Sequence, residues 1–187
     1  GIAASGGTLS NLNALIAARH NAGLGSDPNS VLLVSEDAHS SFIKCTRIMG
    51  LDEANLVRIK TNNNGCIDIQ NLKMTLDKCS IDNKKIFAIV ATLGTTIRGA
   101  IDPIKDISEI CKEKGIWLHI DGSIGGIFAL TSFLTEGLNN INQANSITIN
   151  PQKIIGITKT SSLLLVSNMR TLENTFTTGL PYLSSNE

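Results

Sequence analysis

The stretch Ile116-Trp-Leu-His-Ile-Asp121 is a largely apolar run that closes on a carboxylate. The segment before it, residues 104–114, has the spacing of apolar residues that is typical of a helix, and the run before that, residues 86–91, is again apolar. Near-continuous apolar runs of this length are typical of strands that are buried on both faces of a parallel sheet. This strand–helix–strand unit therefore decides the fold class.

The same alternation continues along the chain in both directions. Strands are predicted at residues 2–4, 31–35, 56–59, 86–91, 116–120, 146–149 and 162–166, and helices at residues 8–21, 40–49, 69–79 and 104–114. Strands that alternate with helices imply right-handed crossovers and helices that cover the sheet. We therefore expect an α/β fold with a mostly parallel, seven-stranded sheet and helices on both faces.

Local signals support the ends of these elements. Asp68 and Asp102-Pro103 are suited to begin the third and fourth predicted helices, and Gly115 is suited to end the fourth. Three asparagines and a glycine at residues 62–65 predict a turn. The polar segment 131–145 is predicted to be a loop with at most one short helix.

The composition excludes several classes of protein. The chain has 187 residues, of which 42% are hydrophobic and 17% charged, and its formal net charge is zero. These values predict one domain with a full core and no nucleic-acid or membrane partner, since such partners require a basic surface or an apolar run of ~20 residues. The cysteine spacings match no zinc or redox pair, so we expect free thiols, no metal site and a cytoplasmic protein. The four cysteines are Cys45, Cys66, Cys79 and Cys111.

Polar side chains follow five of the predicted strands. Carboxyl ends of parallel strands meet at one edge of a sheet, which is where ligands bind in such folds. The segment Ala3-Ala-Ser-Gly-Gly-Thr8 offers glycines, hydroxyl groups and a helix start, which suit one phosphate group; a capped glycine turn is the alternative. The ring of His39 could stack on an aromatic cofactor or bond to nearby backbone. Thr92 would join the same edge, although threonines at strand ends usually satisfy local backbone groups.

An amine and a carboxylate complete this edge. Asp121 would be a strong partner for a protonated ring nitrogen or, alternatively, a cap at the glycine-rich turn that follows it. Lys153 follows the next predicted strand, where its amine could form an imine with an aldehyde or remain a solvated surface charge. Phosphate donors, a stackable ring, hydroxyl groups, a carboxylate and an amine together predict a site for pyridoxal 5′-phosphate (PLP).

Ordered motifs cover most of the chain, from residue 1 to about residue 166. They lie at residues 5–19, 35–41, 90–96, 99–103, 117–121 and 145–153. In order and spacing they resemble the group II PLP-dependent amino acid decarboxylases, carboxy-lyases that act on glutamate, cysteine sulfinate, diaminobutyrate or aromatic amino acids. The resemblance implies a type I PLP-dependent transferase-like large domain, an L-amino acid substrate and a homodimer with the active site near its interface. It also implies that residues 1–187 are one domain of a longer chain, without its N-terminal segment and C-terminal small domain.

The resemblance further implies roles for individual residues. Lys153 would form the Schiff base with the cofactor, His39 would stack on its ring, and Asp121 would bind the ring nitrogen. Ala4 and Ser5 would hold the phosphate. Three more residues would lie close to the phosphate or to the ring, namely Asn150 for the phosphate and Thr92 and Ser123 for the ring.

Two residues depart from the family pattern. Gln152 stands where the family usually has a histidine, and glutamine cannot act as an acid or a base. Ser123 stands where the family usually has an alanine, so the surface that contacts the ring would be more polar. Three alternatives therefore stay open: another type I PLP lyase, a non-catalytic PLP-binding or scaffold domain, and an unrelated α/β domain. The motifs Asn145-Ser and Asn150-Pro favour an acidic substrate of the glutamate or cysteine-sulfinate type, with diaminobutyrate as the other candidate.

Overall fold

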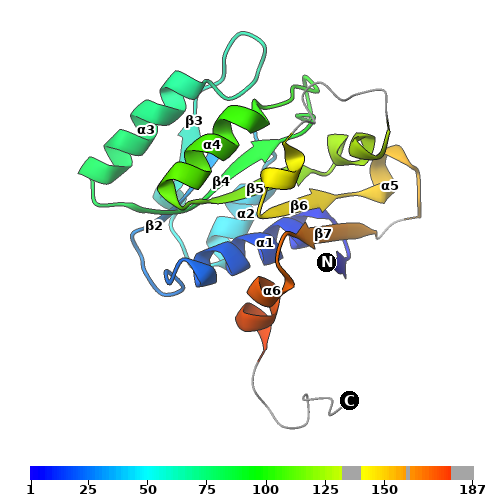
Figure 1. Cartoon of the computed structure of the whole chain (residues 1–187), viewed down its shortest axis with the longest axis horizontal. Helices are drawn as coiled ribbons and strands as arrows, with labels where there is room; N and C mark the ends of the chain where they lie inside the picture. The colour runs from blue at the N-terminus through cyan, green and yellow to red at the C-terminus, as the bar shows by residue number, and fades with distance from the viewer. Residues whose placement is uncertain (132–139, 159–160, 178–187) are drawn as a thin grey trace.

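The structure is a computed structural model that describes residues 1–131, 140–158 and 161–177. Seven strands form one sheet in the order β1-β7-β6-β5-β4-β2-β3, with helices on both faces (Figure 1). The strands are β1 (Ile2–Ala4), β2 (Ser30–Ser35), β3 (Leu56–Ile59), β4 (Lys85–Thr92), β5 (Trp117–Gly122), β6 (Ser146–Ile149) and β7 (Ser162–Val166). The seven predicted strands and the α/β fold class are thus confirmed.

Six of the seven strands run in the same direction. Neighbours among β2, β3, β4, β5 and β6 are parallel, whereas β7 is antiparallel to both β6 and β1. Two strands that are each antiparallel to β7 run the same way as one another, so β1 points in the direction of the five parallel strands. The carboxyl ends of β1, β2, β4, β5 and β6 therefore lie at one edge of the sheet, as the prediction for the polar residues requires.

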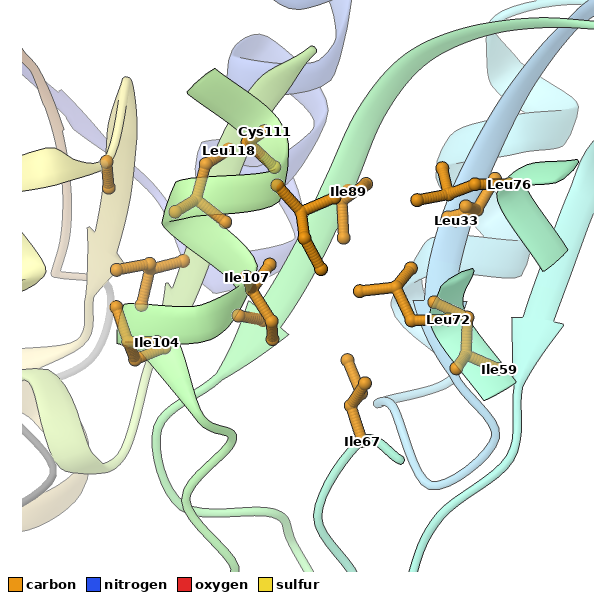
Figure 2. Close-up of a cluster of buried hydrophobic side chains, with 14 of the residues drawn as sticks. Leu33, Ile59, Ile67, Leu72, Leu76, Ile89, Ile104, Ile107, Cys111 and Leu118 are labelled. Atoms are coloured by element: carbon orange, nitrogen blue, oxygen red, sulfur yellow. The ribbon is translucent and has the colours of Figure 1, made fainter. Parts of the chain in front are cut away.

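Four helices cover the sheet, two on each face (Figure 1). They are α1 (Gly7–Asn21), α2 (Ser41–Ile48), α3 (Ile69–Ile81) and α4 (Ile104–Lys114). Leu15 of α1 and Phe42 of α2 belong to one buried cluster. Leu72 of α3 and Ile107 of α4 belong to the other, with Ile89 of β4 (Figure 2). Burial of each such side chain contributes roughly 1.5–3 kcal/mol, which holds both helical layers to the sheet.

The remaining helical elements complete the described chain. They are α5 (Pro151–Ile154), α6 (Met169–Phe176) and the 3-10 helices η1 (Glu53–Asn55), η2 (Gly125–Leu130) and η3 (Ile141–Gln143). The segment predicted as a loop contains the short helix η3, and its residues 132–139 lie outside the described residues. Of the helices in the described ranges, none has both the length and the apolar character that crossing a membrane requires.

The predicted helix ends are partly confirmed. Asp68 caps α3, since its Oδ1 accepts a hydrogen bond from Asn71 N at 2.8 Å. Gly115 ends α4 with a left-handed φ of 65°, a conformation that favours glycine. α4 begins at Ile104, as predicted, but no side chain caps its start. The prediction that Asp102 begins this helix as its cap is therefore wrong.

Asp102 instead joins two segments that are distant in sequence. Its carboxylate accepts hydrogen bonds from Ile67 N and Thr92 N, both at 2.7 Å. The residue is 1% exposed. The end of β4, which carries Thr92, is thus fixed to the segment before α3 by one buried carboxylate, an interaction that no local pattern could indicate.

Replacing Asp102 with asparagine is expected to lower the free energy of unfolding by about 1–3 kcal/mol, because the amide NH2 group cannot accept the second buried backbone hydrogen bond, whereas both oxygens of a carboxyl group keep acceptor capacity when it is protonated. Burial raises the pKa of Asp102 from 3.8 to about 6, although the two backbone hydrogen bonds lower it. A carboxyl group whose pKa rises on folding stabilises the protein fully below its unfolded pKa, and this stabilisation is lost as the pH rises through the folded value. The difference between wild type and Asp102→Asn in urea unfolding should therefore shrink as the pH is raised through about 6. A difference that grows with pH would contradict this account.

The alternation of side chains along β5 determines what faces α1. Leu118 and Ile120 belong to the cluster under α3 and α4, whereas Trp117 belongs to the cluster under α1 and α2. Successive side chains of a strand point to opposite faces, so His119 and Asp121 lie on the same face as Trp117. Two ionisable side chains thus lie within a mostly apolar layer, where they require hydrogen-bond partners.

Candidate active site

A cavity of about 550 Å³ lies where the parallel strands end. Its walls come from the segments that follow β1, β2, β4, β5 and β6. Seven of the eight predicted site residues line it, namely Ser5, His39, Thr92, Asp121, Ser123, Asn150 and Lys153. Ala4 is not part of the lining; it ends β1, where it pairs with Ser162. The volume is that of a typical small-molecule site.

The wall that follows β1 allows a ligand to approach the backbone closely. α1 begins at Gly7, and the start of a helix presents backbone N–H groups without helical partners together with a positive dipole end. A Cβ atom at Gly7 would lie 2.5 Å from Asn150 Nδ2 and 2.8 Å from Ser123 Oγ, so any other residue there would displace these two side chains. Ser5 is exposed in the same wall. This arrangement suits an anion such as a phosphate.

Asp121 is a buried carboxylate in the wall, with 5% of its surface exposed. It lies within β5 rather than after it, because the strand extends to Gly122. Its Oδ1 accepts a hydrogen bond from Ser123 N at 3.1 Å, and its Oδ2 accepts one from Asn11 Nδ2 at 3.2 Å. None of the three salt bridges within the described residues includes it. A buried carboxylate without a cation is costly, so a cationic ligand group would stabilise it.

Lys153 lies at the rim of the cavity, on the short helix α5. Its backbone N–H donates to Asn150 O at 3.0 Å, and Pro151 occupies the first turn, where its missing N–H costs nothing. The side chain is exposed and forms no salt bridge with any described residue. The amine is therefore not held by a carboxylate and remains available for reaction with an aldehyde.

The side chains on either side of Lys153 are held by hydrogen bonds. Gln152 Oε1 accepts from Ser161 N at 3.0 Å. Asn150 Oδ1 accepts from Ser162 Oγ at 2.5 Å, and Ser162 Oγ lies 2.7 Å from Ser10 Oγ of α1. These bonds connect α5 to the start of β7 and to α1. They fix the backbone from which Lys153 projects.

His39 shows the bond that was considered as the alternative to stacking. Its Nδ1 accepts a hydrogen bond from Ser41 N at 3.1 Å. The residue is nevertheless exposed and lines the cavity. A hydrogen bond to Nδ1 lies in the plane of the ring and leaves the ring faces free of that contact. The local bond therefore orients the ring without excluding a stacking role.

Two buried hydroxyl groups in the lining have no hydrogen-bond partner among the described residues, namely Ser41 Oγ and Thr92 Oγ1. A buried polar atom without a partner costs about 1–3 kcal/mol. A polar ligand in the cavity would supply the missing partners. Together with the phosphate wall, the carboxylate and the amine, these hydroxyl groups fit PLP. The described residues contain no cluster of three or more His, Cys, Asp or Glu side chains that could hold a metal ion.

The sequence interpretation missed two residues of this site. Asn11 lines the cavity and bonds Asp121, and Ser41 carries one of the hydroxyl groups without a partner. Helical spacing could have indicated Asn11, because it lies four residues after Gly7 and so on the same side of the helix. Ser41 lies two residues after His39, but nothing in the sequence indicates that its hydroxyl group is buried.

Comparison with known proteins gives a match along the whole chain. The family model described as the pyridoxal-dependent decarboxylase conserved domain matches residues 1–187. The glutamate decarboxylase-like protein FG08083 of Gibberella zeae is 32% identical over 178 residues, which are 92% of this chain and 34% of that protein. The aromatic-L-amino-acid decarboxylase of Bacillus atrophaeus is 31% identical over 188 residues, which are 100% of this chain and 39% of that protein. The chain thus spans about a third to two fifths of the length of these curated relatives.

Solved structures give the same result for the fold. The tryptophan decarboxylase of Catharanthus roseus, in complex with L-tryptophan, superposes with a TM-score of 0.89 at 28% identity, over 95% of this chain and 39% of that one. Mouse CSAD superposes with a TM-score of 0.88 at 26% identity, over 93% of this chain and 38% of that one. The type I fold that the resemblance implied is therefore confirmed.

Proposed function

The chain belongs to the pyridoxal-dependent decarboxylase family, and on that premise we propose that the protein decarboxylates an L-amino acid to the amine and carbon dioxide with PLP in the cavity described above. One observation carries the proposal. The buried carboxylate of Asp121 and the amine of Lys153 lie in the walls of one cavity, together with a helix start suited to a phosphate. An aldehyde, a ring nitrogen and a phosphate are the three groups that these walls suit, and PLP carries all three.

The proposed roles of the cofactor-binding residues follow their places in the cavity. Ser5 and the first N–H groups of α1 would hold the phosphate, with the backbone of Ala4 before them and Asn150 beside them. Asp121 would meet the ring nitrogen, and Lys153 would bind the aldehyde covalently. Three other side chains would lie against the ring, namely His39, Thr92 and Ser123.

The chain's own residues would prepare the reaction in three ways. When it is bound, PLP supplies the electron sink that receives the electron pair left as the carboxylate departs. The ionised Asp121 favours a protonated ring nitrogen opposite it, which makes the sink stronger. Lys153 has an amine at the rim that can hold a proton and return it to the α-carbon. Gln152 cannot exchange protons and accepts a backbone hydrogen bond, so it would orient the Lys153 segment instead.

We also propose that the chain is the large domain of a longer cytoplasmic protein that forms a homodimer near this cavity. The share of the relatives' length that it spans supports the first part. All four cysteines are free thiols, which supports a reducing compartment. Exposed apolar side chains in the cavity lining and in the segment that follows Lys153 support a subunit interface there. They are Leu9, Ile48, Ile154, Ile155 and Ile157.

The experiment that tests this function measures carbon dioxide release by the full-length protein with PLP. We expect release from one substrate class among glutamate, aspartate, cysteine sulfinate, diaminobutyrate and the aromatic amino acids, with the acidic group first. Consumption of a substrate by carbon–carbon cleavage without carbon dioxide would replace the proposal with another PLP lyase.

Gln152 favours a second candidate, a protein that binds PLP without catalysis. That candidate predicts a normal absorption band of lysine-bound PLP and no turnover of any amino acid in the same screen. Absence of the band would exclude both candidates. The screen therefore separates the two PLP proposals from one another and from an unrelated activity.

A further inference from the structure

A row of buried hydrogen bonds leads across the sheet to Asp121, on the face that α1 covers. Trp117 Nε1 and His119 Nδ1 each lie 2.8 Å from Ser146 Oγ. On the other side of the ring, His119 Nε2 lies 3.0 Å from Asn11 Oδ1. Asn11 Nδ2 lies 3.2 Å from Asp121 Oδ2. All five side chains are at most 9% exposed, and we call them the Trp117–Asp121 row.

The alternation of side chains along β5 and the register between β5 and β6 bring this row together. Trp117, His119 and Asp121 alternate along β5 and so share one face. The parallel register places Ser146 of β6 opposite His119. Asn11 lies one turn into α1, where it reaches the same face from above the sheet. The row therefore links the first helix of the chain to two central strands.

One arrangement of protons satisfies every atom in the row. An ionised Asp121 can only accept, so Asn11 must donate from Nδ2 and accept at Oδ1. His119 then donates from Nε2, and its Nδ1 accepts from the Ser146 hydroxyl group. Trp117 can only donate, and it donates to Ser146 Oγ. Burial lowers the pKa of His119, and the nearby Asp121 opposes this shift without reversing it, which agrees with a neutral ring.

We propose that Asn11 and His119 are positioning residues for Asp121: Asn11 supplies one of the two hydrogen bonds to its carboxylate and so fixes Oδ2, and His119 holds Asn11 in the orientation that this bond requires. This inference rests on the proposed function, in which Asp121 meets the ring nitrogen of PLP. Within the row, only Asn11 and Asp121 line the cavity. His119 therefore acts on the site through Asn11, and Ser146 acts through His119.

A purely structural role for the row leads to a different order of effects. If the row only filled the space between α1 and the sheet, the isosteric change Asn11→Asp would be the mildest, because it keeps an acceptor for His119. If Asn11 is needed as a donor to Asp121, the same change is the most harmful, since it places a second carboxylate against the first. Asn11→Leu removes both bonds at a similar volume and should lie between wild type and Asn11→Asp.

The test measures the dissociation constant of PLP and the values of kcat and KM for the full-length protein. We expect Asn11→Leu to weaken PLP binding at least about tenfold, as the loss of a hydrogen bond to a charged group does, and Asn11→Asp to weaken it further. kcat should fall with PLP affinity, while KM changes less. Asn55→Leu is the matched control, because Asn55 is likewise a buried amide, and it donates to Pro28 O and Ser30 O outside the cavity lining. It should lower stability and leave PLP affinity unchanged.

A second measurement does not depend on activity. Nitrogen NMR of histidine-labelled protein, with the His119 signals assigned through His119→Gln, should show a neutral ring with the proton on Nε2, in the absence and presence of PLP. A proton on Nδ1, a cationic ring, or wild-type PLP affinity in Asn11→Asp would overturn the inference. If wild type itself binds no PLP or releases no carbon dioxide, the proposed function has failed, which is a different result from unchanged Asn11 variants in an active protein.

Discussion

Lys153→Ala is expected to abolish both the visible absorption band of lysine-bound PLP and the release of carbon dioxide. The alanine side chain has no amine with which an aldehyde could react, and no other lysine lines the cavity within the described residues. We expect the band to disappear and kcat to fall by at least about 10³-fold, since a covalent step would be lost. Absorption spectra with and without borohydride, together with carbon dioxide release, measure the two effects.

Two control variants separate this role from the effect of charge. Lys153→Arg keeps a cation at the rim but forms no stable imine, so it should lose the band as completely as alanine does. Lys73→Ala removes an exposed lysine of α3 and should leave the spectrum and the rate unchanged. The same borohydride-sensitive band in Lys153→Ala would exclude Lys153 as the residue that binds PLP.

Asp121→Asn is expected to lower kcat by about 10²–10³-fold, which corresponds to about 3–4 kcal/mol of transition-state stabilisation. The change keeps the size of the side chain and removes its charge. A neutral amide opposite the ring nitrogen no longer favours the protonated, electron-accepting ring. PLP affinity should fall as well, because the cationic ring would lose its buried partner. Titration with PLP and steady-state kinetics measure the two changes.

The effect of Asp121→Asn on kcat can be compared with the effects of two other substitutions. Asp77→Asn changes an exposed aspartate of α3 and should have no effect on kcat. Asn11→Leu leaves the charge of Asp121 in place, so its effect on kcat should be smaller than that of Asp121→Asn. Wild-type kcat in Asp121→Asn would exclude a bond between this carboxylate and the ring nitrogen.

The strands and the cavity edge could be predicted because their signals are local. β2, β4 and β5 are apolar runs buried on both faces, and each lies within two residues of its predicted limits. Once the strands are assigned, parallel topology alone brings their carboxyl ends together. Ser5, Asp121 and Lys153 thus enter one cavity although the segments between them are long. The location of these three residues could therefore be predicted without knowledge of side-chain contacts.

The rest depended on contacts between distant segments. The residues around Asp102 in the sequence predict a helix cap, but its carboxylate accepts hydrogen bonds from Ile67 N and Thr92 N instead. α5 has four residues, too few for a periodic pattern. His119 looks like one polar interruption in an apolar strand, and its role depends on Asn11, which lies more than a hundred residues earlier.

The antiparallel strand β7 determines when the first strand can join the sheet during folding. Within the described residues β1 pairs only with β7, where Ile2 lies opposite Leu164, so the first strand has no place in the sheet until β7 has been synthesised and docked. Pairing across such a separation is slow, because a long loop must close before any contact stabilises it. The strand that leads into the phosphate wall therefore acquires its place in the sheet only after β7 has docked. On the ribosome, β1 would join the sheet after β5, which carries Asp121, has been synthesised.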